Sequence, residues 1–184
     1  LTASLALCLL LGATSSLAQP RLVLQITVDG LRADLLQRYA GNFSRGGFDY
    51  LRRQGTSYTN AFYLHANTET IVGHTTLATG ATPAIHGMVG NVWYHQASGE
   101  LGYNIEDAQA PMLPTRTATA EGAQLDPAQK RSRSAGRSPR AILAPTISDT
   151  IKIASQGGAK VFGVSGKDRS AVAMAGKAGT AYWY

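Results

Sequence analysis

The chain has 184 residues, 44% of them hydrophobic, and a formal net charge of +6 at pH 7. This length is sufficient for one ordinary domain with a core of its own, and the positive charge admits partners that carry phosphate. The only cysteine, Cys8, lies in an apolar leader, which excludes a mature fold held together by disulfides.

Residues 1–18 have the composition of a secretory signal peptide. They carry no charge and centre on an apolar run from Leu5 to Leu11, which is too short to span a bilayer. Small residues at Ser16 and Ala18 fit the positions that signal peptidase reads, so we expect cleavage after Ala18 and a periplasmic or secreted protein with no stable membrane span. Without an initiator Met and a basic n-region, the signal is expected to be truncated. A buried N-terminal helix and a lipoprotein anchor at Cys8 are the alternatives.

The first predicted element is a strand over residues 21–28. Arg21 to Val28 form a nearly continuous, β-prone apolar run, which is typical of a strand buried on both faces of a parallel sheet. The run ends in Asp29-Gly30. Ligands of open α/β sheets bind outside the carboxyl ends of the strands, so Asp29 is a candidate site residue. The simpler alternative is that Asp29 is only a turn residue before glycine.

Three elements are predicted before the next motif. They are a helix through Leu31, Leu35 and Tyr39 that ends at Gly41, a short helix around Phe48 and Leu51 that ends at Gly55, and a strand over 57–63.

A stretch dense in hydroxyl groups follows at residues 66–80, with a helix predicted to begin near Thr70. Free backbone N–H groups and the helix dipole favour negative charge at such a position, so it can hold an oxyanion beside a nucleophilic hydroxyl. Thr70 is the candidate nucleophile and Thr68 its rival. The structural alternative is that Thr70 serves as a helix cap.

The middle of the chain predicts little regular structure. Short extended pieces are expected at 91–94 and 103–107, followed by a long surface loop over about 108–140. This loop is basic and has no aromatic residue, so it lacks the stacking platform of a single-stranded nucleic-acid site. A run of charges of this kind is usually a solvated surface, and we predict no nucleic-acid partner.

The last segment predicts a helix and a strand. Thr146, with Asp149 three positions later, indicates a capping box, and the helix is expected to end at Gly157. Residues 160–165 form a second core strand, followed by the polar run 166–169. The β-α-β-α order is typical of a doubly wound α/β fold, with a mostly parallel sheet and helices on both faces.

Taken together, these pieces resemble the alkaline phosphatase superfamily, and within it the bacterial periplasmic alkaline phosphatases that use a threonine nucleophile, relatives of the type I phosphodiesterases and nucleotide pyrophosphatases. The matching pieces occur in family order and are Val28–Arg32, Thr70–His74, Thr79–Gly87, Val89–Tyr94, Ser138–Arg140, Gly163–Arg169 and Ala181–Tyr184. The resemblance covers most of residues 22–184 apart from the basic loop, and residues 19–184 are expected to form the N-terminal part of the catalytic domain.

The resemblance implies a zinc-dependent phosphate monoester hydrolase that forms a phospho-threonine intermediate on Thr70. Asp29 and Thr70 would bind one of two Zn²⁺ ions, and a hydroxyl held by zinc is an activated nucleophile. Asn91, Lys167 and Arg169 would bind the phosphoryl oxygens of small phosphate monoesters. Two cations favour a monoester because a diester replaces one of those oxygens with a bulky group.

The remaining zinc ligands of the family are Asp and His residues in a C-terminal portion, and no acid or histidine follows Arg169 here. We therefore expect an N-terminal fragment that is inactive alone. The four histidines are expected to be structural. The alternative functions are a phosphodiesterase or nucleotide pyrophosphatase of the same superfamily, and a non-catalytic phosphate- or polyanion-binding protein that uses the basic loop. The natural substrate and the oligomeric state stay open.

Overall fold

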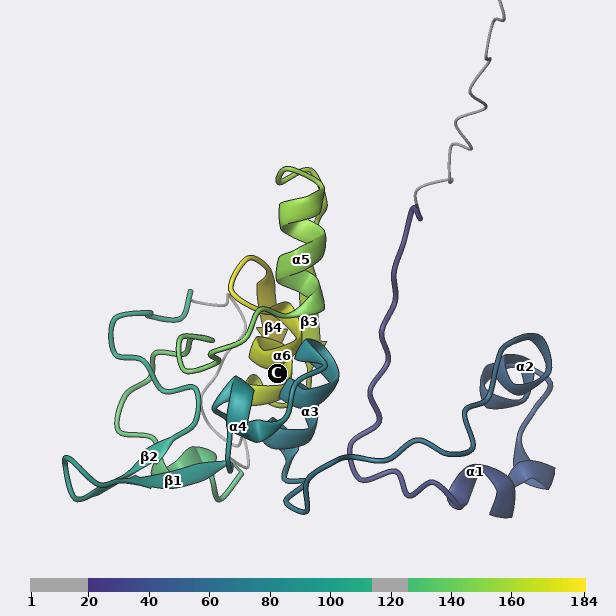
Figure 1. Ribbon diagram of the computed structural model, residues 1–184, viewed down its shortest axis with the longest axis horizontal. Coiled ribbons are helices and arrows are strands. Elements are labelled where there is room, and N and C mark those ends of the chain that lie inside the picture. Colours follow the sequence, from purple (N-terminus) through teal and green to yellow (C-terminus); the bar gives the residue numbers. More distant parts are fainter. Residues whose placement is uncertain (1–19, 114–125) are drawn as a thin grey trace, which may run out of the picture.

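The computed structural model describes residues 20–113 and 126–184, so the predicted signal peptide at 1–18 lies outside the described residues. The elements, in order, are α1 (Leu35–Arg38), η1 (Ala40–Asn42), α2 (Gly47–Gln54), α3 (Thr70–Thr79), α4 (Pro83–His86), β1 (Val92–His95), β2 (Glu100–Tyr103), η2 (Gln129–Arg131), α5 (Ile147–Ala154), β3 (Phe162–Ser165), α6 (Asp168–Ala175) and β4 (Thr180–Trp183) (Figure 1). Within the described ranges, no helix is long and apolar enough to cross a membrane.

The core lies between α3, α6 and the hairpin of β1 and β2. Its buried apolar residues come from segments far apart in the sequence and are Ile71, Val72, Met88, Tyr103, Ile105, Ile142, Val172 and Ala173. The helix α3 begins at Thr70, as predicted, and ends where Gly80 adopts φ +69° and closes the last turn. A left-handed glycine at this position is a common way for a helix to end.

A parallel β-α-β unit completes the core. The predicted strand at 160–165 forms as β3, which pairs in parallel with β4 while α6 lies between them in the sequence. A Cβ atom on Gly163 would lie 2.2 Å from the carbonyl oxygen of Ala171, so only glycine lets α6 approach β3 this closely. Neither α6 nor β4 is predicted by the sequence pattern, whereas the predicted capping box of α5 is confirmed at Thr146 and Asp149.

The hairpin of β1 and β2 is antiparallel and pairs Val92 with Tyr103. The predicted extended piece at 91–94 is therefore confirmed. The one predicted at 103–107 is wrong beyond Tyr103, because the chain turns there and the N–H of Glu106 donates to the carbonyl oxygen of Tyr103. An isolated bridge then joins Glu106 to Arg137.

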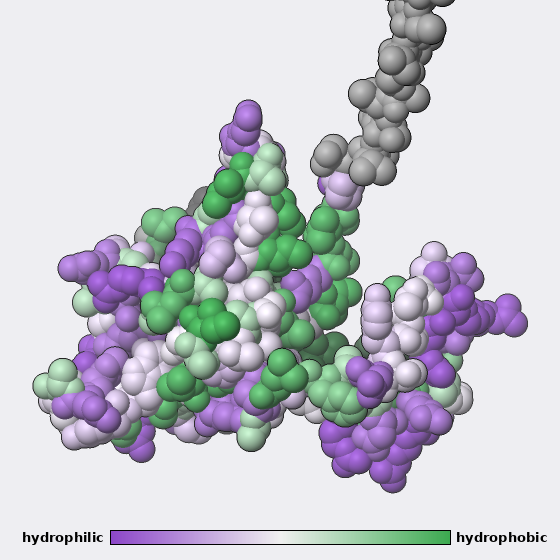
Figure 2. All heavy atoms as spheres, in the orientation of Figure 1, coloured by the Kyte–Doolittle hydropathy of each residue, from purple (hydrophilic) through white to green (hydrophobic). Residues whose placement is uncertain are grey.

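Residues 20–64, which we call the arm, extend away from this core, and none of them is buried (Figure 1). The predicted strand at 21–28 is extended but pairs with no other strand of the described chain, and Leu22, Leu24 and Ile26 are exposed. The space-filling view shows hydrophobic spheres along this extended segment (Figure 2). An apolar run sets an extended conformation, but a strand also needs a partner for its backbone groups, and none of the described residues supplies one.

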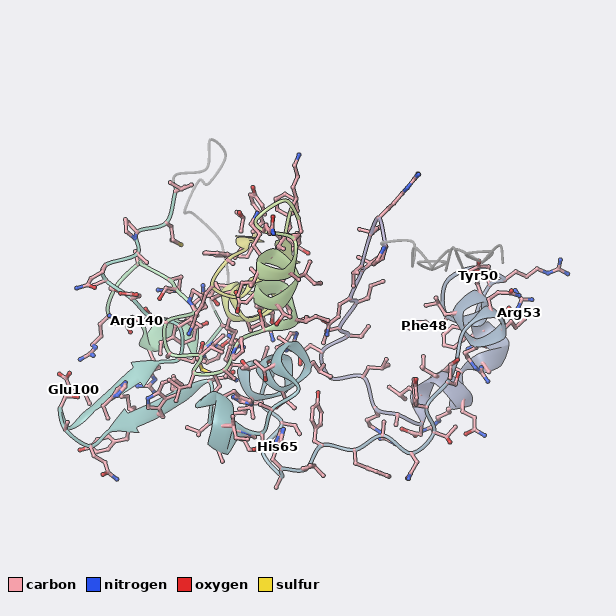
Figure 3. All side chains as sticks on the ribbon, turned by 45° about the horizontal axis from the view of Figure 1, so that its top comes forward. Phe48, Tyr50, Arg53, His65, Glu100 and Arg140 are labelled. Atoms are coloured by element: carbon pink, nitrogen blue, oxygen red, sulfur yellow. The ribbon has the colours of Figure 1, made fainter. Side chains whose placement is uncertain are left out.

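The other predictions for the arm also need correction. The helix expected through Leu31, Leu35 and Tyr39 is reduced to one turn, α1, followed by the 3₁₀ turn η1. The strand expected over 57–63 does not form. The second short helix forms as α2, whose side chains at Phe48, Tyr50 and Arg53 lie far from α3 (Figure 3).

Candidate active site

Asp29 and Thr70 lie in direct contact, although 41 positions separate them in the sequence. A tight turn closed by a bond from the N–H of Leu31 to the carbonyl of Val28 presents Asp29, and Gly30 takes φ +73° in that turn. Thr70 is the first residue of α3, and its hydroxyl donates to Asp29 Oδ2 over 3.0 Å. Asp29 is therefore a turn residue whose carboxylate also contacts the candidate nucleophile.

Lys167 is the third member of this cluster. It precedes α6, and its Nζ donates to Asp29 Oδ2 over 3.3 Å. Burial by itself would raise the pKa of Asp29, but the hydrogen bonds from Thr70 and Lys167, together with the charge of Lys167, outweigh it, so the pKa lies below its usual value. The carboxylate is therefore ionised at neutral pH, the state in which it can bind a cation.

Asn91 lies at the same end of α3. The backbone N–H of Ile71 donates to Asn91 Oδ1 over 3.2 Å. Because a backbone N–H only donates, the amide oxygen must face the helix and the amide NH₂ points elsewhere. The side chain of Glu69, the residue before the helix, makes no capping bond to α3. The first turn of α3 therefore keeps the positive end of its dipole toward the cluster.

The structure does not bring Arg169 into contact with Asp29 or Thr70. Arg169 is 2% exposed in the first turn of α6, and its Nη2 donates to Asp126 over 2.9 Å. The hydrogen bond from Arg169 and, further, the charge of Lys167 lower the pKa of Asp126. The charge of Lys167 therefore acts on two carboxylates, Asp29 and Asp126, and Arg169 pairs with the second of them.

A buried network around Asp168 supports this end of α6. Tyr103 donates its hydroxyl to Asp168 Oδ1 over 2.5 Å, and Arg137 donates Nε to Asp168 Oδ2 over 2.7 Å. Arg137 belongs to the segment expected to be a solvated basic loop, but only 7% of its side chain is exposed. That expectation is wrong for Arg137, because a buried carboxylate required a cationic partner.

The histidines make hydrogen bonds within the protein. The ring of His74 donates from Nδ1 to the carbonyl of Thr70 over 2.7 Å. Thr76 bridges the two rings of His65 and His86, at 3.0 Å from each. The N–H of Met88 donates to His86 Nδ1, so His86 Nε2 carries the proton that Thr76 accepts. These contacts agree with the structural role expected for these three histidines.

The fit to a metal ion is partial. Asp29 and Thr70 offer two oxygen ligands that already converge, which suits one side of a zinc site. Over residues 20–113 and 126–184, however, no group of three His, Cys, Asp or Glu side chains could hold an ion. A tetrahedral ion at Asp29 and Thr70 would need two ligands in addition to these two residues.

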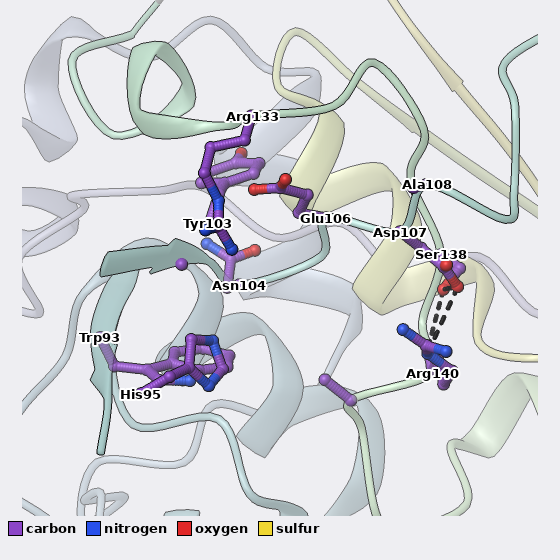
Figure 4. A pocket seen from close by; sticks show the side chains of 12 residues that line it. Trp93, His95, Tyr103, Asn104, Glu106, Asp107, Ala108, Arg133, Ser138 and Arg140 are labelled. Atoms are coloured by element: carbon purple, nitrogen blue, oxygen red, sulfur yellow. Dashed lines mark hydrogen bonds and ion pairs between the residues drawn. The ribbon is translucent and has the colours of Figure 1, made fainter. Parts of the chain in front are cut away.

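One hollow of the described surface lies apart from this cluster. It is a cavity of about 340 Å³ beside the hairpin, with Trp93, His95, Arg133 and Arg140 in its wall (Figure 4). Neither Asp29, Thr70 nor Lys167 lines it. The candidate active site is thus defined by the polar groups that converge on Asp29 and not by this cavity.

Sequence reasoning missed three acids that hold the site together, namely Glu69, Asp126 and Asp168. Two of them stand beside residues that it did select, since Glu69 precedes Thr70 and Asp168 lies between Lys167 and Arg169. An acid directly beside a candidate anion-binding residue is the sequence signal that could have identified these two. Asp126 offered no comparable signal, because it lies 43 positions from its partner.

Known proteins are similar to this chain in sequence and in structure. The chain is 34% identical to alkaline phosphatase PafA of Elizabethkingia meningoseptica over 95% of its length. It is 35% identical to a protein of Myroides odoratus named calcium-transporting ATPase over 93% of its length. It spans only 30% and 29% of these two relatives.

A crystal structure of alkaline phosphatase PafA superimposes with a TM-score of 0.72 at 31% identity, over 85% of this chain and 28% of that one. In that variant a threonine, an asparagine, a lysine and an arginine were replaced. The described chain thus has an α/β fold of the alkaline phosphatase type. Residues 23–162 match the sequence model of the type I phosphodiesterase / nucleotide pyrophosphatase family, and the chain, with Asp29 and Thr70 in contact at the start of α3, belongs to that family.

Proposed function

We propose that the protein is a metal-dependent phosphate monoester hydrolase that forms a phospho-threonine intermediate on Thr70. The observation that carries the proposal is the 3.0 Å contact between the hydroxyl of Thr70 and the ionised carboxylate of Asp29 at the N-terminus of α3. A nucleophilic hydroxyl needs a partner that takes or displaces its proton, and a helix N-terminus favours the anion that it attacks.

The spacing of the relative's replaced residues supports the assignment. The replaced threonine and asparagine stand 21 positions apart there, as Thr70 and Asn91 do here. Its lysine and arginine stand two positions apart, as Lys167 and Arg169 do. All four residue types therefore recur in this chain at matching separations within each pair.

In the proposed reaction, Thr70 Oγ1 attacks phosphorus in line with the ester oxygen. A bond forms between Oγ1 and phosphorus, the ester P–O bond breaks, and the alcohol leaves with the proton that the Thr70 hydroxyl gives up. Water then attacks phosphorus, the bond to Thr70 breaks, one proton of the water returns to Thr70 Oγ1, and inorganic phosphate leaves. Lys167 and the amide NH₂ of Asn91 bind non-bridging oxygens as charge develops on them.

Arg169 adds its charge to that of Lys167, with Asp126 as its counter-ion, and we propose that both cations select monoesters. Asp29 and Thr70 are the proposed ligands of one of two zinc ions. The chemistry that zinc supplies when bound is a lower pKa for the coordinated hydroxyl. We propose a periplasmic or secreted location, the expected consequence of a signal peptide over residues 1–18.

Two alternatives are separated by experiment. The family also contains phosphodiesterases, so hydrolysis of an aryl phosphate and of its methyl diester by the intact protein should be compared with zinc present. We expect the monoester to be preferred, and a preference for the diester contradicts the proposal. A polyanion-binding protein is less favoured, because Arg137 of the basic segment is committed to Asp168.

A further inference from the structure

The segment before Thr70 holds the segment that carries Asn91 through two side chains. Asn67 donates its Nδ2 to the carbonyl oxygen of Val89 over 2.8 Å. Glu69 accepts the backbone N–H of Asn91 at Oε2 over 2.5 Å. Asn67 Oδ1 also accepts the N–H of Glu69 over 3.2 Å and so orders the segment itself. We call these contacts the clasp.

The clasp is one of three restraints on Asn91. Its N–H is held by Glu69, its carbonyl accepts Asn104 Nδ2 over 2.6 Å, and its side-chain oxygen accepts the N–H of Ile71. Of the polar groups of Asn91, only the side-chain NH₂ makes no hydrogen bond to another residue of the described chain. Its two donors remain available to a ligand at the N-terminal end of α3.

Glu69 has an electrostatic cost at this position. A carboxylate next to Thr70 repels an anion bound at the helix N-terminus. The side chain also does not cap α3, the common use of an acid there. Its one hydrogen bond in the described chain goes to the N–H of Asn91, and a carboxylate acceptor makes such a bond roughly twice as strong as a neutral one.

We propose that Glu69 is a positioning residue, whose carboxylate fixes Asn91 so that the amide NH₂ meets a phosphoryl oxygen bound at Thr70. This inference rests on the proposed function, because the phosphoryl group is the ligand it assumes. The favourable effect of Glu69 acts through Asn91 alone, and this distinguishes it from a residue that merely stabilises the loop.

A double-mutant cycle on the intact protein tests this dependence. We expect Glu69→Ala to lower kcat/KM for an aryl phosphate about tenfold in the unaltered protein and to cause no loss in an Asn91→Ala background, where removing its repulsive charge can only help anion binding. Glu69→Gln keeps an acceptor at the same reach and should lose only about two- to threefold. Glu100→Ala is the matched control, an exposed acid paired with Arg133, and should leave the kinetics unchanged.

An equal loss from Glu69→Ala in both backgrounds would overturn the inference, as would no loss in either. The same cycle is also read as affinity for inorganic phosphate, and hydrogen exchange of the Asn91 N–H should accelerate in Glu69→Ala. If the unaltered protein does not hydrolyse the ester, the proposed function fails. The affinity for inorganic phosphate then tests the role of Glu69. A loss of affinity from Glu69→Ala that occurs only when Asn91 is present supports the inference, and an equal loss in the Asn91→Ala background contradicts it.

Discussion

The arm and the rest of the described chain contain similar apolar residues but bury them very differently. Ile71 and Val72 of α3 are completely buried, whereas Leu24 and Ile26 of the arm are about 70% exposed, at 71% and 69%. Local sequence does not explain the difference, because both stretches are strongly apolar. The surroundings explain it: α3 has α6 beside it, and the segment at 21–28 has no neighbouring strand among the described residues.

The candidate active site crosses this boundary. Asp29 comes from the arm, while Thr70 and Lys167 come from the packed body, and the contacts that join them here are a hydrogen bond and an ion pair. An exposed ion pair of this kind contributes little stability. Substitutions in the two regions should therefore have separable effects on activity and on stability.

The largest effect is expected at the junction of the two regions. Replacing Thr70 with Ala removes the proposed nucleophile and should lower kcat/KM for an aryl phosphate by at least about 10³-fold, with little change in stability. Thr68→Ala is the control, since Thr68 is exposed and is the rival candidate, and it should stay within about threefold of the unaltered protein. The opposite ranking of the two variants would move the nucleophile to Thr68.

Within the body, Asp168→Asn should cost about 3–5 kcal/mol of unfolding free energy, because it leaves buried Arg137 without its counter-charge. Asp34→Asn breaks a pair of the arm in which Asp34 is 49% exposed, and should cost less than about 0.5 kcal/mol. Urea unfolding followed by circular dichroism measures both. Similar midpoints for these two variants would contradict the contrast drawn between arm and body.

A smaller, pH-dependent effect is expected at His86. Burial, and then the charge of His65, lower the pKa of His86 below 6.5, so the folded state favours the neutral ring. The stability that this contributes is complete above pH 6.5 and is lost as the pH falls through the lowered pKa of the folded state.

Thermal unfolding measured at neutral pH and at about pH 5 tests this expectation. The unfolding temperature of the unaltered protein should fall between these two pH values. His86→Asn should make this fall smaller, and His95→Asn, at an exposed histidine, should leave it unchanged. An unchanged drop in His86→Asn would place the pH sensitivity in other groups.

The smallest effect is expected in the arm. Leu24→Ser removes an apolar side chain that is 71% exposed, and should change the unfolding free energy by less than about 0.5 kcal/mol. Val72→Ser makes a comparable change at a side chain that is completely buried, and should cost several-fold more. A large loss for Leu24→Ser would show that residues 21–28 are covered in solution.

The sequence by itself predicted the elements whose signals are local. Thr146 and Asp149 lie within one helical turn, so their capping box could be read directly, and the apolar run at 160–165 gave β3 its conformation. The start of α3 was predicted at Thr70 from the hydroxyl-rich stretch, and the motif order led to the family. The roles assigned to Asp29, Thr70, Asn91, Lys167 and Arg169 stay predictions.

Only the tertiary structure decided which charges meet. Arg169 lies beside Asp126 and not beside Asp29, and Arg137 leaves its basic segment to neutralise Asp168. It also left the apolar run at 21–28 without a partner strand among the described residues. Burial and ion pairing depend on what lies alongside a residue in space, and neither charge nor hydropathy along the chain carries that information.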